Sequence, residues 1–114
     1  LSSDFKIRYL SPKFYIDLYN FINKEKIELN DLNINFLLNY VFNKRNYFKD
    51  DFVGENLQIL IEIYFYNKII SRNNFENDYK SFKQTMNKIN NMNKFNLDKD
   101  SSLLEIKNII VNER

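Results

Sequence analysis

The fold is decided by residues 57–70, which read LQILIEIYFYNKII and form the most apolar run of the 114-residue chain. With a period of two residues, one face of a β-strand would carry Ile59, Ile61, Ile63 and Phe65. With a helical period the apolar residues form two adjacent stripes. The first stripe is Leu57, Leu60, Ile61 and Tyr64, and the second is Ile59, Ile63, Tyr66 and Ile70. A run of about fourteen residues is long for one strand and ordinary for a helix. The run therefore predicts a central helix that its neighbours cover on two or three sides.

The amino-acid composition indicates a small globular domain whose core is filled largely by aromatic side chains. Hydrophobic residues make up 44% of the chain and include 11 Phe and 8 Tyr, while Cys, His and Trp are absent. Such a chain can build one core without disulfides or metals. The favoured types, Asn, Ile, Lys, Phe and Tyr, have mostly A and T in their codons, which indicates an AT-rich genome. We expect one helical domain over residues 1–114, either complete or cut from a longer protein.

Two further helices are predicted before the central run. After a short extended arm over residues 1–10, Ser11 is a preferred N-cap and Pro12 suits the first position of a helix that runs to about Lys24. Asn30 or Asp31 caps the next helix, which ends near Lys44 and Arg45. The predicted buried stripes are Phe14, Leu18, Phe21 and Ile22 in the first helix and Ile34, Leu37, Leu38, Val41 and Phe42 in the second.

Two positions near the central run allow alternative interpretations. Gly54, the single glycine, either breaks a short turn or permits a close approach of two backbones. Glu62 is either a buried carboxylate or part of the exposed strip of the central helix, and we favour the exposed strip. The central helix is expected to fade at residues 71–73.

Two helices are predicted after the central run, which makes five. Asn73 or Asn74 caps the fourth helix. The fifth begins at residues 100–102, where Ser102 and Glu105 have the spacing of a capping box. Its inward-facing residues are Leu103, Ile106, Ile109 and Ile110. The predicted fold class is all-α, a compact bundle or short array of about five helices around a central apolar helix.

The most regular apolar pattern lies in the predicted fourth helix. Its members are Phe75, Tyr79, Phe82, Met86 and Ile89, continued by Met92. Steps of four and three residues keep one seam of a helix facing a partner. We predict that Phe75, Tyr79, Phe82 and Met86 contact a protein partner or a second copy of the chain.

The same helix carries the main basic surface of the sequence. Lys80, Lys83, Asn87, Asn91 and Lys94 project within an arc of about 80°, at about 100° per residue, and no acid occurs between the first and last of them. These residues give the alternative function, nucleic-acid binding through phosphate contacts. A net charge of +2 is small for such a domain, and charge runs are more often solvated faces.

The residue inventory argues against catalysis. Without His and Cys, the usual general base, activated nucleophile and zinc ligands are missing, and a single Gly excludes glycine-rich phosphate loops. Candidate carboxylate groups remain at Asp50 or Asp51 with Glu55 and at Asp98 with Asp100, and we interpret both as marks of helix N-termini. We therefore expect no enzymatic activity, no catalytic or metal-binding residue, no cofactor and no small-molecule substrate.

The sequence thus predicts a non-catalytic helical protein–protein interaction module, such as an adaptor or a scaffold, that can self-associate. No signal peptide is recognisable at the start of the chain. No stretch reaches the roughly eighteen apolar residues of a membrane span, because Glu62 and Lys68 interrupt the best one. These two features favour an intracellular location.

Overall fold

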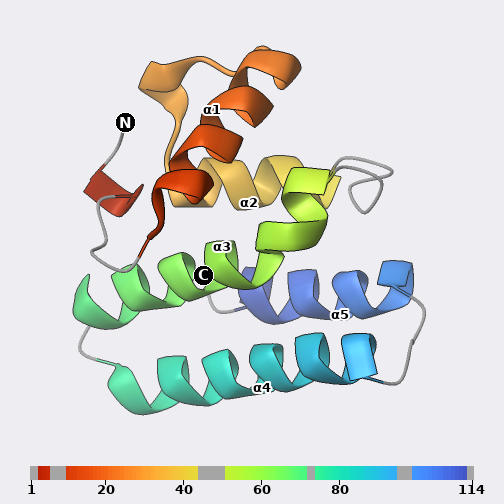
Figure 1. Cartoon of the computed structure of the whole chain (residues 1–114). Coiled ribbons are helices and arrows are strands. Elements are labelled where there is room, and N and C mark those ends of the chain that lie inside the picture. Colours follow the sequence, from red (N-terminus) through yellow and green to blue (C-terminus); the bar gives the residue numbers. More distant parts are fainter. Residues whose placement is uncertain (1–2, 6–9, 44–50, 72–73, 95–98, 113–114) are drawn as a thin grey trace. The chain divides into compact units, whose positions relative to one another are not determined.

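The computed structural model describes residues 3–5, 10–43, 51–71, 74–94 and 99–112. Over these residues it contains five α-helices, two short 3-10 helices and no strand, which confirms the predicted all-α fold (Figure 1). The α-helices are α1 (Pro12–Glu25), α2 (Ile34–Asn43), α3 (Asp51–Ser71), α4 (Phe75–Lys94) and α5 (Lys99–Asn112). The 3-10 helices are η1 (Ser3–Phe5) and η2 (Leu29–Asp31).

The chain divides into two compact units, residues 1–63 and residues 64–114. The boundary falls inside α3, so this predicted central helix contributes residues to both units. A single domain over residues 1–114 stays a prediction.

Helix α1 begins where its sequence predicts. The Oγ atom of Ser11 accepts a hydrogen bond from the amide of Phe14 at 3.2 Å, and Pro12 is the first helical residue. The helix extends one residue beyond the predicted Lys24 and stops because Lys26 takes a left-handed conformation with a φ of 56°. The predicted core residues of α1 are all buried: Phe14, Leu18, Phe21 and Ile22.

Helix α2 begins later than its sequence predicts. Neither Asn30 nor Asp31 caps it, because both belong to η2, and this prediction is wrong. The cap is Asn33, whose Oδ1 atom accepts a hydrogen bond from the amide of Phe36 at 2.8 Å. The predicted end at residues 44 and 45 lies outside the described residues. The predicted core residues of α2 are all buried: Ile34, Leu37, Leu38, Val41 and Phe42.

Residues 3–5 form a 3-10 helix and are not extended as predicted, while residues 1–2 and 6–9 of the predicted arm lie outside the described residues. The ring of Phe5 is fully buried, and its carbonyl accepts a hydrogen bond from the hydroxyl of Tyr15. Asp4 reaches the start of α2, where its Oδ2 atom accepts a hydrogen bond from the amide of Ile34 at 3.1 Å. A carboxylate at a helix N-terminus satisfies an otherwise free donor and is favoured by the helix dipole.

Helix α3 confirms the helical interpretation of the central run and excludes one of the two roles expected of Gly54. This residue lies inside the helix without a positive φ, so it does not break a turn. Glu62 is half-buried, and its Oε1 atom accepts a hydrogen bond from Gln58 at 3.3 Å. The stripe Leu57, Leu60, Ile61 and Tyr64 is buried throughout. The other stripe is buried only in part, because Tyr66 and Ile70 are 50% and 65% exposed.

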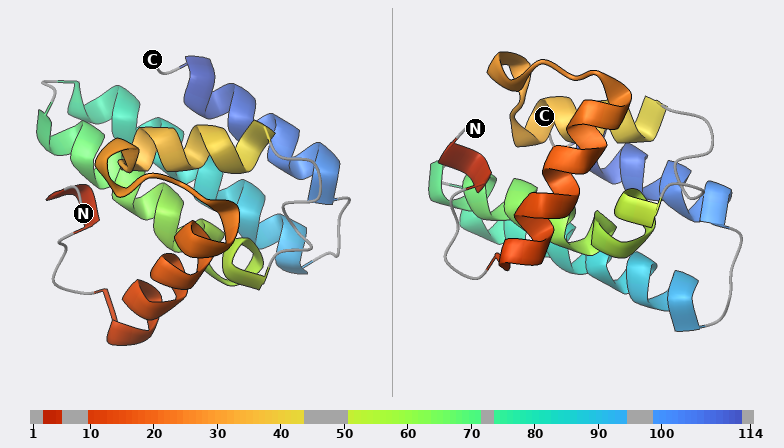
Figure 2. Two further views of the ribbon diagram at one scale, coloured as in Figure 1. Left: turned by 90° about the horizontal axis from the view of Figure 1, so that it is seen from above. Right: turned by 45° about the horizontal axis from the view of Figure 1, so that its top comes forward.

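In the second unit, α4 and α5 lie side by side and run in opposite directions (Figures 1 and 2). The carbonyl of Asn74 accepts a hydrogen bond from the amide of Asp78 at 3.1 Å, while Asn73 lies outside the described residues. Helix α5 begins at Lys99, so Ser102 lies inside it and is buried, and the predicted capping box is wrong. The inward-facing residues of α5 are Leu103, Ile106 and Ile110, while Ile109 is half-buried.

Candidate functional site

The buried face of α4 coincides only in part with its apolar pattern. Ile89 and Met92 of that pattern are buried, but the same face continues towards the N-terminus through small or polar residues, namely Asp78, Ser81 and Thr85. The hydroxyl of Thr85 donates a hydrogen bond to the Ser81 carbonyl at 2.9 Å, so burial leaves this polar group satisfied. The large apolar residues of the predicted pattern are displaced towards solvent as a result.

Phe75, Tyr79, Phe82 and Met86, the predicted partner-binding residues, form an apolar strip that is partly exposed. Phe75 is 58% exposed and Tyr79 is 42% exposed, whereas Phe82 and Met86 are half-buried. The rings of Phe75 and Tyr79 stack with centroids 5.6 Å apart and planes 9° from parallel. Phe82 also contacts Phe65 of α3, with centroids 5.6 Å apart, so the strip packs against α3 at this residue.

The second predicted surface, the basic strip, is exposed along its whole length. Its members are Lys80, Lys83, Asn87, Asn91 and Lys94, and each of them is exposed. The two strips meet at Lys83, whose Nζ atom lies 5.3 Å from the ring centroid of Tyr79. An ammonium over a tyrosine ring is attracted by the ring's electron-rich face. The basic strip therefore borders the apolar strip directly.

Acidic side chains limit the positive charge around the basic strip. Lys88, which lies to one side of it, forms an ion pair with Glu105 of α5 at 2.7 Å. Glu76 lies one helical turn before Lys80 on the same side of α4, at the N-terminal end of the strip. Among the described residues, neither Lys80 nor Lys83 is paired with an acid, so the positive charge begins at Lys80.

A buried ion pair lies at the N-terminal half of α4, and the sequence analysis did not predict it. Lys68 of α3 places its Nζ atom 3.9 Å from Oδ1 of Asp78 and 5.5 Å from the ring centroid of Tyr64. Both oxygens of the Asp78 carboxylate are buried without a hydrogen bond among the described residues. The available signal was a lysine inside the most apolar run together with an acid on the α4 face that carries Ser81 and Thr85.

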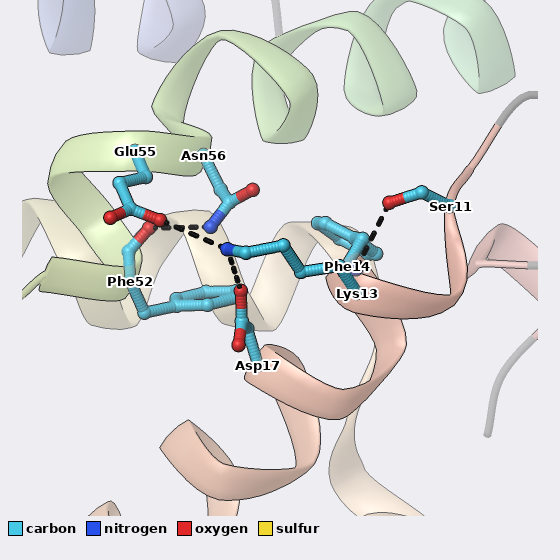
Figure 3. A network of polar contacts seen from close by, with 7 residues as sticks. All are labelled: Ser11, Lys13, Phe14, Asp17, Phe52, Glu55 and Asn56. Carbon is cyan, nitrogen blue, oxygen red and sulfur yellow. Dashed lines mark hydrogen bonds and ion pairs between the residues drawn. The ribbon is translucent and has the colours of Figure 1, made fainter.

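The first unit holds a charged pocket of about 350 Å³. Its lining residues are Lys13, Asp17, Asn20, Phe21, Lys24, Asp51, Phe52 and Glu55. Lys13 lies between two of the carboxylates, at 2.8 Å from Oδ2 of Asp17 and 3.4 Å from Oε2 of Glu55 (Figure 3). Its hydrogen bond to Asp17 and then that to Glu55 raise the pKa of the Lys13 ammonium above its ordinary value.

This pocket brings together two of the carboxylates that the sequence singled out, Asp51 and Glu55. Asp50 and Asp98 lie outside the described residues, as does the side chain of Asp100. Lys13 neutralises part of the carboxylate charge, and the rings of Phe21 and Phe52 stack beside the pocket with centroids 4.8 Å apart. The arrangement is a surface ion-pair network over an aromatic cluster.

Comparison with known proteins gives no assignment for this chain, because no protein-family model, curated protein or solved structure matches it significantly. In the part of the chain that the structure describes, no helix is long and apolar enough to cross a membrane. The same part holds no group of three or more acidic side chains placed to bind a metal ion.

Proposed function

We propose that this chain is a non-catalytic helical module that binds another protein through the apolar strip of α4. One observation carries the proposal, the stacked pair of Phe75 and Tyr79 with 58% and 42% of their surfaces exposed. Aromatic side chains supply large contact areas at a small cost in conformational entropy, and tyrosine is enriched at the energetic centres of interfaces.

The half-buried members of the strip support the same function. Phe82 and Met86 continue the line of Phe75 and Tyr79 along about three turns of helix. A partner that covers the exposed pair also meets this line, and the flexible thioether of Met86 can adapt to its shape. The strip is short, so we expect a transient complex near the low end of interface sizes.

Site-specific photo-crosslinking tests the proposal in the cells that make the protein. A photoreactive phenylalanine analogue at position 75 or 79 is expected to form an adduct with one discrete protein. The matched control carries the same analogue at Tyr66, which is 50% exposed on α3 and lies outside the strip. Equal adducts at all three positions, or none at positions 75 and 79, would contradict the proposal.

The exposed basic strip favours a second candidate function, nucleic-acid binding. Three lysines on one face can contact about three phosphates, which predicts a logarithmic salt slope of about −2 for a single strand. Titration of a labelled single-stranded oligonucleotide at several salt concentrations tests this candidate. Replacement of Lys80, Lys83 and Lys94 by Glu must abolish binding if the candidate is correct, because these side chains supply all the cations of the strip.

A further inference from the structure

The two strips of α4 form one surface with an aromatic centre and a single positive edge. Their nearest members, Tyr79 and Lys83, are four residues apart and therefore about 40° apart around the helix. The Nζ atom of Lys83 lies 5.3 Å from the Tyr79 ring centroid, so the ammonium leans towards the aromatic pair. Whatever covers Tyr79 consequently also covers part of Lys83.

Covering Lys83 removes water from its charge. An ammonium that loses water without gaining an opposite charge or a hydrogen-bond acceptor weakens the complex. A wholly apolar partner would pay this cost without compensation, whereas a carboxylate placed beside its apolar residues would offset it. Lys80 lies one turn away on the same edge and offers a second site for a partner acid.

Charge also argues against a second copy of this chain as the occupant. In a twofold interface the same surface patch meets itself, so lysines from both copies would lie in one contact. Among the described residues of α4, Glu76 is the one exposed acid on this side of the helix, so each copy brings one acid against the three lysines of its basic strip, while Glu105 of α5 is already paired with Lys88. Like charges facing each other in an interface are unfavourable.

The length and spacing of the surface fit a helix. From Phe75 to Met86 the apolar strip is about 16 Å long, and from Lys80 to Lys94 the basic strip is about 21 Å long. Steps of four, three and four residues match the packing of one helix along another. A partner helix of about twenty residues therefore spans both strips, which together run from Phe75 to Lys94.

We infer that α4 binds an acidic amphipathic helix of another protein, one whose apolar stripe covers Phe75 and Tyr79 and whose flanking carboxylates meet Lys80 and Lys83. The inference rests on the proposed function and adds the chemical class of the partner. In this inference the apolar strip supplies most of the binding affinity, and the two lysines select acidic partners over neutral or basic ones.

Three synthetic helical peptides of one length test the inference against the whole chain. All carry the same leucine stripe at positions i, i+3 and i+7, and their flanks are Glu, Gln or Lys. We expect the Glu peptide to bind about tenfold more tightly than the Gln peptide and the Lys peptide to bind most weakly. The preference must shrink as salt rises from about 50 to about 500 mM, because these charges are exposed.

Charge reversal on α4 supplies the decisive variant. The double variant Lys80→Glu, Lys83→Glu is expected to bind the Glu peptide at least tenfold more weakly and to bind the Lys peptide most tightly of the three. The matched control is Lys24→Glu, an exposed lysine on α1 in the other unit, which must leave all three affinities unchanged. Circular dichroism and the melting temperature establish that each variant is folded.

The possible outcomes separate this inference from the function on which it rests. The Glu and Gln peptides could bind equally well, with both affinities lost in the double variant Phe75→Ser, Tyr79→Ser. This result would overturn the inference that the partner is acidic and would leave the proposed function standing. Absence of binding by every peptide, together with no adduct in the crosslinking experiment, would overturn both. If an oligonucleotide binds more tightly than the Glu peptide and this binding is lost on reversal of the lysines, the occupant of the surface is a nucleic acid and the inference is overturned. If the chain dimerises with rising concentration through the apolar strip, the occupant is a second copy of the chain and the inference is likewise overturned.

Discussion

The Nζ atom of Lys68 lies 3.9 Å from Oδ1 of Asp78, and only 8% and 0% of the two side chains are exposed. The pair joins the last turn of α3 to the first turns of α4 within the second unit. Burial of two charges has a large desolvation cost, which their attraction offsets only while both are present. The pair therefore makes the folded state depend strongly on either partner.

Removal of one charge of this pair is expected to destabilise the protein severely. Asp78→Asn or Lys68→Met alone should lower the free energy of unfolding by about 3–5 kcal/mol, because the remaining charge stays buried without the opposite charge of the pair. Lys68→Met combined with Asp78→Leu should recover most of this loss. Urea unfolding of the three variants measures the effect, and single variants that each cost less than about 1 kcal/mol would contradict this account.

Gly54 gives a prediction of the opposite sign. It is exposed within α3 and has no positive φ, so a side chain is tolerated there. Gly54→Ala should raise the free energy of unfolding by about 0.5–1 kcal/mol, because alanine loses less backbone entropy in a helix. Gly54→Asn should raise the free energy of unfolding by less than Gly54→Ala does, since asparagine is a weaker helix former than alanine. A lower melting temperature for Gly54→Ala would indicate that the backbone there needs the freedom of glycine.

The cap of α2 can be tested with two neighbouring asparagines. Asn33→Ala should lower the free energy of unfolding by about 1 kcal/mol, because the Phe36 amide loses the acceptor that lies 2.8 Å away. Asn35→Ala is the matched control, an exposed residue inside α2 where alanine is the better helix former. Thermal unfolding measures both, and equal effects would show that the Asn33 side chain contributes nothing as a cap.

The ion pairs of Lys13 predict a dependence of stability on alkaline pH. Hydrogen bonding to Asp17, then to Glu55, raises the pKa of this ammonium in the folded state above its ordinary value of 10.5. Because the folded state holds the Lys13 proton more tightly than the unfolded state does, the charged ammonium stabilises the fold below pH 10.5. This contribution is lost as pH rises through the pKa of Lys13 in the folded state.

Thermal unfolding of Lys13→Met across this range provides the measurement. Its melting temperature should be slightly lower than that of the unmodified protein at neutral pH, and the difference should vanish at alkaline pH and in high salt. Lys13→Arg is the matched control, since a guanidinium keeps its charge throughout the range. A difference that grows with pH would contradict the sign of the prediction.

The helices could be predicted from the sequence where the determinants are local. Ser11 followed by Pro12 marks the start of α1, and the apolar stripes of α1 and α2 are buried as their spacing predicts. Choosing the cap of α2 failed because this asparagine-rich chain offers a cap at nearly every turn. The interaction of Asp4 with the amide of Ile34 spans thirty residues, so no local pattern could reveal it.

Hydrophobic spacing selected Phe75 and Tyr79 as partner-binding residues of α4, and this role stays a prediction. The spacing does not show which side chains of α4 are buried. The structure buries Ser81 and Thr85, because small side chains permit close packing and Thr85 satisfies its hydroxyl within the helix. Partners across two helices, such as Lys68 and Asp78, depend on a register that sequence spacing does not contain.

Because α3 belongs to both units, a cut between residues 63 and 64 divides this helix between two polypeptides. Each fragment would end in a frayed half-helix with Leu60 and Ile61 on one side of the cut and Phe65 on the other, all normally shielded from water. Expression of separate halves should accordingly yield products that are less stable than the whole chain.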